Sequence, residues 1–264
     1  MKFAGKVTGS LIKPFAYLFI ITLLIFIITN YIRVQTPSPG GIIQESYNQP
    51  IQKELSKAIK PFEISSIRNS KYLVTPKFEY EISGLVVSEH DTQGFSDISH
   101  EMWGDSLNIK DLCILFGDDL KTSNYKKMKF SNGDYVCYFN GPDDVFAAFN
   151  IYNISNNHIL SGDQKLIDKI RTIKPGDQIR IHGYLASYSN TKGFSRGTST
   201  TREDTGNGAC ETIYLTEVEI IKENVPQISQ AYNWSKTLIP FEFASLILLI
   251  LSNAYFTNNF YRQV

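Results

Sequence analysis

The chain begins and ends with long apolar runs, and between them polar and apolar residues alternate. Residues 14–32 carry no charged side chain. A helix of about 20 apolar residues crosses the hydrocarbon layer of a membrane. Residues 1–33 are therefore predicted to be a short cytoplasmic N-terminus followed by a transmembrane helix. The alternative is a cleaved signal peptide, but the run is longer than the core of one and no small-x-small cleavage site follows at residues 31–34.

A second apolar run covers residues 238–256, so residues 226–264 are predicted to form a second transmembrane helix and a short tail. Pro240 and Glu242 stand near its start. We expect Glu242 at the interfacial depth, where an acid costs less than at mid-bilayer. The alternative is a terminal amphipathic or core helix. Aromatic residues gather at both ends of the run, as in membrane belts: Trp234, Phe241, Phe243, Tyr255, Phe256, Phe260 and Tyr261.

The flanking charges predict the orientation. Lys2, Lys6 and Lys13 precede or open the first run and no acid accompanies them, so the positive-inside rule places the N-terminus in the cytoplasm. Arg262 places the C-terminus there too. The domain between the runs is then periplasmic or otherwise extracytoplasmic. The composition, rich in Asn, Ile and Lys, is typical of a bacterial protein and favours the bacterial inner membrane.

Between the two runs, the pattern predicts a linker and one domain. Residues 34–70 begin with a stretch rich in Pro, Gly, Ser and Gln, which indicates a linker, and residues 51–60 show the spacing of a short amphipathic helix. Residues 71–225 contain several alternating, β-branched segments, which predict a β-rich ectodomain. The fold class is therefore mainly β (α+β), with one or more helices.

The clearest local pattern covers residues 161–189. Ser161 or Asp163 can cap a helix that carries Leu166, Ile167 and Ile170 at helical spacing. A Lys-Pro-Gly-Asp turn at residues 174–177 follows it, and residues 178–189 then alternate as a half-buried strand. Arg180, His182 and Tyr184 lie on the polar face of this strand.

This order of elements resembles a known class of barrel. A strand-rich opening, a helix, the strand PGDQIRIHGYL (residues 175–185) and a last strand ending in EVEII (residues 217–221) are similar to the oligonucleotide/oligosaccharide-binding (OB) type. The likeness covers about residues 78–222 and implies a small barrel of five strands with one helix. Residues 100–160 form an extra segment that a barrel of five strands and one helix does not require.

The interior also resembles uncharacterised bacterial membrane-anchored proteins. The stretches W-x-D-x-L-N-x-x-D-L-C (residues 103–113) and TREDTGNGAC (residues 201–210) carry this likeness. It implies a membrane-anchored ectodomain and no particular activity.

The charge balance excludes one class of partner. Residues 34–236 hold 21 basic and 25 acidic residues, so the domain is mildly acidic. Sequence-independent binding of nucleic acid needs a basic face that neutralises phosphates. We therefore expect no nucleic-acid partner.

Three cysteines are candidates for a disulfide or for catalysis. Cys113 and Cys137 both lie in predicted strands, and disulfides persist outside the cytoplasm, so these two are a candidate pair. The alternative is that all three are small buried hydrophobes. Cys210 with His182 or His158 is a candidate thiol–imidazole arrangement, although no local signature supports it.

Two loops contain further candidate sites. His90, Asp91, Asp97 and His100 offer imidazole and carboxylate ligands for Zn²⁺ or a similar metal, and the alternative is a hydrated loop whose acids cap turns. In the loop 189–208, Arg196 lies among glycines and hydroxyl groups that could bind an anion, and so does a second arginine, Arg202. The alternative there is a surface hairpin loop.

The sequence favours a non-enzymatic function. Trp103 is a candidate partner anchor or a core residue. We expect the domain to be an interaction or scaffold module of an envelope complex, bound to the lipid bilayer, to other membrane proteins or to further copies of itself. A metal- or thiol-dependent hydrolase is one alternative. A binder of small ligands or polysaccharide through Arg180, His182 and Tyr184 is another. No cofactor is expected.

Overall fold

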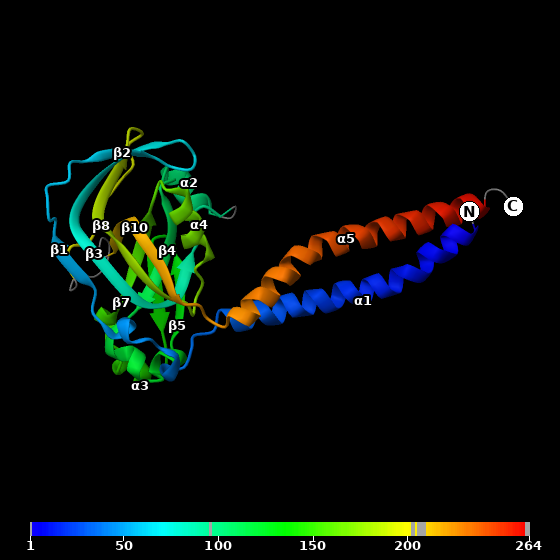
Figure 1. Ribbon diagram of the computed structural model, residues 1–264, viewed down its shortest axis with the longest axis horizontal. Helices are drawn as coiled ribbons and strands as arrows, with labels where there is room; N and C mark the ends of the chain where they lie inside the picture. The colour runs from blue at the N-terminus through cyan, green and yellow to red at the C-terminus, as the bar shows by residue number, and fades with distance from the viewer. Residues whose placement is uncertain (1, 95–96, 202–203, 205–209, 262–264) are drawn as a thin grey trace. The chain divides into compact units, whose positions relative to one another are not determined.

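The computed structural model describes residues 2–94, 97–201, 204 and 210–261, and it contains a mixed α+β chain that is mostly β. Figure 1 shows two long terminal helices and one large sheet with smaller helices around it. The chain divides into two units. One combines the two helical ends, up to Gln35 and from Val225, and the other covers residues 36–224.

The helical unit consists of α1 (Lys2–Arg33) and α5 (Pro226–Tyr261), which run antiparallel and side by side (Figure 1). The rings of Phe19 and Phe243 lie 5.9 Å apart in a tilted arrangement, and the ring of Phe26 stacks on that of Tyr232 at 5.1 Å. Among the described residues, both helices are long and apolar enough to cross a membrane, and hardly any of their apolar surface is buried. Exposed apolar surface of this extent is stable in lipid rather than in water. The two helices are therefore compatible with membrane anchoring.

The Glu242 carboxylate has a partner on the other terminal helix. Thr22 donates a hydrogen bond of 3.0 Å to the Glu242 carboxylate. Thr22 stands near the middle of the uncharged run 14–32, so the carboxylate lies beside the centre of α1 rather than its end. The expected interfacial depth of Glu242 stays a prediction, because this contact identifies the partner of the acid and not its position in a bilayer.

The second unit is built around β3 (Lys71–His90), a 20-residue strand. It pairs with β4 (Asn108–Leu115), which pairs with β7 (Ile154–Leu160). β7 pairs in parallel with β10 (Glu211–Lys222), β10 pairs with β8 (Gln178–Asn190), and β8 returns to β3. β1 (Ile51–Glu54), β2 (Phe62–Ser65) and β9 (Ser195–Arg196) complete the large sheet of 8 strands.

One helix covers the main core. α4 (Gln164–Thr172) begins after Asp163, whose carboxylate accepts the backbone N–H of Lys165 at 2.7 Å. Its Ile167 and Ile170 are fully buried against the inward residues of β3, β4, β8 and β10. The helix and cap expected around residues 161–173 are therefore present, with Asp163 as the capping residue.

A second, smaller sheet is the two-stranded hairpin of β5 (Lys129–Gly133) and β6 (Val136–Asn140). Cys137 of β6 forms a disulfide with Cys113 of β4, so a covalent bond joins this hairpin to the large sheet. The remaining elements are short: α2 (Ile98–Trp103), α3 (Asp143–Ala147) and 3₁₀ turns at Pro39–Gly41, Gln44–Tyr47, Gly117–Lys121, Asn124–Lys127 and Ile151–Asn153.

The segment between the first helix and the sheet differs from the expected linker. The predicted amphipathic helix at residues 51–60 is wrong, because Ile51–Glu54 form β1 along the edge of β3. The segment before it is docked onto the sheet, since the Gln178 amide bonds both Ile43 and Gly41. Edge pairing with β3 satisfies the backbone of this segment and overrides its weak helical pattern.

Candidate functional site

Three connections that are far apart in sequence meet around Tyr135. They are the β3–β4 connection, the β5–β6 turn and the β8–β10 connection. Ser99 donates to Asp134 at 2.7 Å, and the Arg196 guanidinium lies 3.7 Å from the centre of the Tyr135 ring. The polar residues of these connections form two adjoining groups, one of potential metal ligands and one of buried charges.

The metal-ligand cluster consists of His90, Asp97, His100 and Asp134, which each offer a ligand atom within 4.8 Å of the others. One Asp97 carboxylate oxygen lies 2.7 Å from His90 Nε2 and 2.7 Å from His100 Nδ1. Three of the four candidate ligands from the loop are thus brought together. Asp91 is not among them, because its carboxylate caps the turn at Gln93.

Local structure explains the position of Asp97. Its second oxygen accepts the backbone N–H of His100 at 2.9 Å, which caps α2 and fixes the side chain. Burial raises the pKa of Asp97. The backbone hydrogen bond from His100 and the hydrogen bonds and charge of the two imidazoles outweigh burial, so this pKa lies below its ordinary value. Asp97 is therefore an anionic acceptor between two imidazole rings.

Tyr135 connects the two groups. It has a positive φ of 59°, a conformation that few non-glycine residues adopt, and this places its ring under α2. The ring lies 4.2 Å from that of His100, 5.4 Å from Trp103 in a stacked arrangement, and 5.2 Å from His158. A tyrosine in the turn of a hairpin thus becomes the centre of the site.

The buried charge network lies on the other side of Tyr135. The Asp105 carboxylate, almost fully buried, accepts hydrogen bonds from the hydroxyl groups of Tyr135 at 2.5 Å and Tyr188 at 2.6 Å. Burial and the charge of Asp105 raise the pKa of both tyrosines well above the ordinary value. Both therefore remain protonated and donate to the carboxylate.

Asp111 and His158 form the deepest pair, with no exposed surface on either side chain and 2.6 Å between Oδ1 and Nδ1. Burial lowers the pKa of His158, but the charge and hydrogen bond of Asp111 reverse this and hold the pKa above its ordinary value. Arg196 acts in the opposite direction. Its guanidinium lies 2.7 Å from His158 Nε2, and because a guanidinium only donates, this hydrogen bond forms with the neutral ring and competes with protonation of Nε2.

Cys210 lies at the edge of this network, beside Asn156 and Tyr135. Its thiol donates to the Tyr135 carbonyl at 3.5 Å and accepts from the Asn156 amide at 3.6 Å. A thiol nucleophile needs an imidazole that accepts its proton. Here both ring nitrogens of His158 already have partners, Asp111 at Nδ1 and Arg196 at Nε2, so Cys210 is one member of a packed polar network. His182 is not in contact with Cys210 among the hydrogen bonds and ion pairs of the described residues.

Of the two arginines expected to bind an anion, Arg196 is used internally by Tyr135 and His158. Arg202 lies outside the described residues. Trp103 is 47% exposed and stacks on Tyr135 with one face. On the same short helix Ile98 is 66% and Met102 is 72% exposed, so α2 presents an apolar face to solvent.

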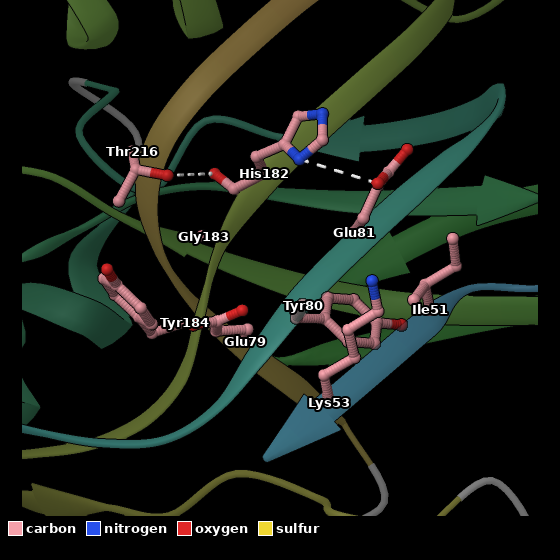
Figure 2. A pocket seen from close by; sticks show the side chains of 9 residues that line it. All are labelled: Ile51, Lys53, Glu79, Tyr80, Glu81, His182, Gly183, Tyr184 and Thr216. Carbon is pink, nitrogen blue, oxygen red and sulfur yellow. Dashed lines mark hydrogen bonds and ion pairs between the residues drawn. The ribbon is translucent and has the colours of Figure 1, made fainter. Parts of the chain in front are cut away.

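A separate pocket lies across β1, β3, β8 and β10 (Figure 2). It has a volume of about 250 Å³ and is lined by cross-strand pairs, among them Glu81 opposite His182 and Glu79 opposite Tyr184. The His182 imidazole lies 3.6 Å from the Glu81 carboxylate. Arg180 does not line the pocket, because its guanidinium pairs with Glu219 at 2.6 Å.

The sequence pattern did not single out Asp111, Asp134 or Tyr135 as site residues. One feature of the chain does point to the buried pair of Asp111 and His158. β7 has the sequence ISNNHIL and is buried along its whole length, so polar residues in it must be hydrogen-bonded inside the fold.

Comparisons of the chain with protein-family models, with curated proteins and with solved structures found no match. The structure therefore defines a protein with a β-rich domain and two terminal apolar helices. A function can be proposed only from the residues of this chain.

Proposed function

We propose that this is a membrane-anchored envelope protein whose extracytoplasmic domain is an OB-like barrel that binds a second protein held at the same membrane. The observation that carries the proposal is the exposed apolar face of α2, formed by Ile98, Met102 and Trp103. Methionine and tryptophan are enriched at protein interfaces, and tryptophan often supplies much of the binding energy.

The strand pairings support the OB-like barrel. They run from β3 through β4, β7, β10 and β8 back to β3, with one parallel pair, and α4 stands between β7 and β8. In OB folds the ligand-binding loops follow the first and fourth strands of the barrel. The corresponding connections here follow β3 and β8, and they contribute α2 and Arg196 to the candidate site.

The rigidity of α2 also supports a binding role. Asp97 caps its first turn, Gly104 ends it in a left-handed conformation, and Trp103 stacks on Tyr135. An anchor that is already ordered loses less conformational entropy when a partner binds. A short helix held in this way, with its apolar side chains in water, is suited to a partner of complementary apolar character.

Two observations support the location. The apolar helices α1 and α5 are compatible with membrane anchoring, and the lysines near the N-terminus favour a cytoplasmic start. The Cys113–Cys137 disulfide fits an oxidising compartment, which the cytoplasm is not. A partner anchored in the same membrane would meet the domain at a high local concentration.

The test is site-specific photo-crosslinking in intact membranes. A photoreactive residue at position 102 is expected to capture one membrane protein, and a photoreactive residue at position 151 is the matched exposed control. In a second experiment, Met102→Ser and Trp103→Ala should release the same partner in a detergent pull-down, while Ile151→Ser should retain it. Capture of a second copy of this chain, or no crosslink specific to position 102, would overturn the proposal.

A second candidate function rests on the pocket in Figure 2. Carboxylates, an imidazole and a phenol line this pocket, which suits a small polar ligand such as a sugar. Its test is binding of soluble envelope saccharides by the wild type and by His182→Ala and Tyr184→Ala. Equal binding by all three proteins would exclude this candidate.

A further inference from the structure

The four residues of the metal-ligand cluster come from three separate segments. His90 ends β3, Asp97 and His100 belong to the start of α2, and Asp134 lies in the β5–β6 turn. We infer that they bind one divalent transition-metal ion of the Zn²⁺ type. The ion would fix α2 to the β5–β6 hairpin. Binding of the ion does not depend on the proposed partner.

The donor set selects the class of metal. Two imidazole nitrogens and two carboxylate oxygens suit Zn²⁺ and similar first-row ions, whereas Ca²⁺ and Mg²⁺ prefer oxygen ligands alone. All four positions are filled by protein side chains. A tetrahedral ion with four protein ligands has no open position for substrate, so this would be a structural site rather than a catalytic one.

The distances lie close to those of a bound ion. Tetrahedral ligands at ordinary Zn–N and Zn–O lengths are separated by about 3.3 Å. The Asp97 oxygen is 2.7 Å from each imidazole nitrogen, and the whole set lies within 4.8 Å. Small side-chain rotations of His90, which is half-buried, and of Asp134, which is exposed, would bring all four ligands to bonding distance.

Both carboxylates already have the outer partners that orient metal ligands. The second oxygen of Asp97 accepts the His100 backbone N–H, and Asp134 accepts the Ser99 hydroxyl. Such outer hydrogen bonds tune metal affinity in known sites. Asp97 and His100 are buried, so the ion would reach the site from the side of His90 and Asp134.

The competing interpretation is a hydrogen-bonded His–Asp–His group with no ion. In that case the two imidazoles donate to Asp97 and the carboxylate only caps α2. The two interpretations differ in one measurable property, which is tight, stoichiometric metal uptake that depends on Asp134. Asp134 makes no hydrogen bond or ion pair to either imidazole among the interactions of the described residues.

The experiment uses the full-length chain, purified in detergent with a histidine-free tag and stripped with a chelator. The protein is titrated with Zn²⁺ against a chromophoric competitor, and Co²⁺ substitution reports the coordination geometry by its visible spectrum. We expect a single equivalent of Zn²⁺ and a tetrahedral Co²⁺ spectrum. His90→Gln and Asp134→Asn should each weaken Zn²⁺ binding by about tenfold or more, because each removes a ligand.

The controls separate this site from others in the chain. His182→Gln, Asp91→Asn and Cys210→Ser should bind Zn²⁺ as tightly as the wild type. Circular dichroism of each variant checks folding, and the side chains of His90 and Asp134 are not fully buried, so both substitutions are compatible with the fold. No stoichiometric uptake by the wild type, unchanged binding by Asp134→Asn, or loss of binding in Cys210→Ser would each overturn the inference.

Discussion

The disulfide between Cys113 and Cys137 should stabilise the β-rich unit by an amount that follows from its loop length. The two cysteines are 24 residues apart, and closing a loop of this length lowers the entropy of the unfolded chain by an amount equivalent to about 3.4 kcal/mol at 25 °C. Cys137→Ala removes the crosslink and should therefore cost about 3.4 kcal/mol of unfolding free energy. Cys113→Ala/Cys137→Ala should cost roughly 1 kcal/mol more, because the Cys113 side chain is fully buried and its sulfur leaves a small cavity.

The assay is guanidinium unfolding of the full-length protein in detergent under oxidising conditions. Trp103 fluorescence reports the β-rich unit once Trp234 in α5 is replaced by phenylalanine. With a slope of about 5 kcal/mol per molar, a loss of 3.4 kcal/mol lowers the midpoint by roughly 0.7 M. Cys210→Ala keeps the crosslink and is the control.

A midpoint for Cys137→Ala within about 0.2 M of the wild type would refute this reasoning, provided that the wild type is oxidised. So would alkylation of both cysteines in the freshly isolated protein, since it would place the domain in a reducing compartment. The fluorescence itself gives a second readout. The hairpin of β5 and β6 forms a sheet separate from the large one, so without the crosslink Tyr135 should pack less firmly under Trp103.

Three further changes test other parts of the fold. Gly183→Ala should abolish or severely lower expression of folded protein, because the added methyl group would collide with the Tyr214 carbonyl oxygen on β10; a melting curve decides this. Arg196→Met should raise the pKa of His158 further, since the guanidinium disfavours the imidazolium; the titration of the ring in NMR spectra checks it. In Arg196→Met, the stability that His158 contributes is present below about pH 6.5 and is lost as the pH rises through the raised pKa of His158. An Arg196→Met protein whose free energy of unfolding does not fall in alkaline solution would contradict the assignment. Glu242→Leu should favour membrane insertion of α5 by about 3 kcal/mol if the carboxylate lies at mid-depth, and by well under 1 kcal/mol if it lies at the interface; a glycosylation-mapping assay distinguishes the two.

Much of the fold could be predicted because its signals are local. The helix after Asp163 shows its cap and its apolar spacing within ten residues, and the strand from Gln178 shows alternation bounded by a Pro-Gly turn. The two apolar ends are recognisable by length alone. The edge strand at Ile51–Glu54 was missed because its four residues are all exposed, so burial left no alternating pattern in the sequence.

The candidate site was predictable only in part, for a physical reason. His90, Asp97 and His100 lie within one short loop, where spacing alone makes them candidates. Asp134 reaches them through the hairpin, and Asp111 meets His158 through the pairing of β4 with β7. Such contacts depend on the register of strands that are distant in sequence, and no local pattern records that register.

The buried charges around Tyr135 are better explained by the orientation of α2 than by stability. A buried network of this kind is often no more stabilising than an apolar core, because desolvating the charges offsets their attraction. Its hydrogen bonds are directional, however, and here they hold one ring. Asp105 fixes the Tyr135 hydroxyl, and Arg196 lies over the face of the ring. Trp103 stacks on that same ring, so the network determines where the exposed apolar face of α2 is presented. Under the proposed function, Tyr135→Phe should therefore weaken crosslinking of the proposed partner at position 102, although Tyr135 itself would not touch that partner.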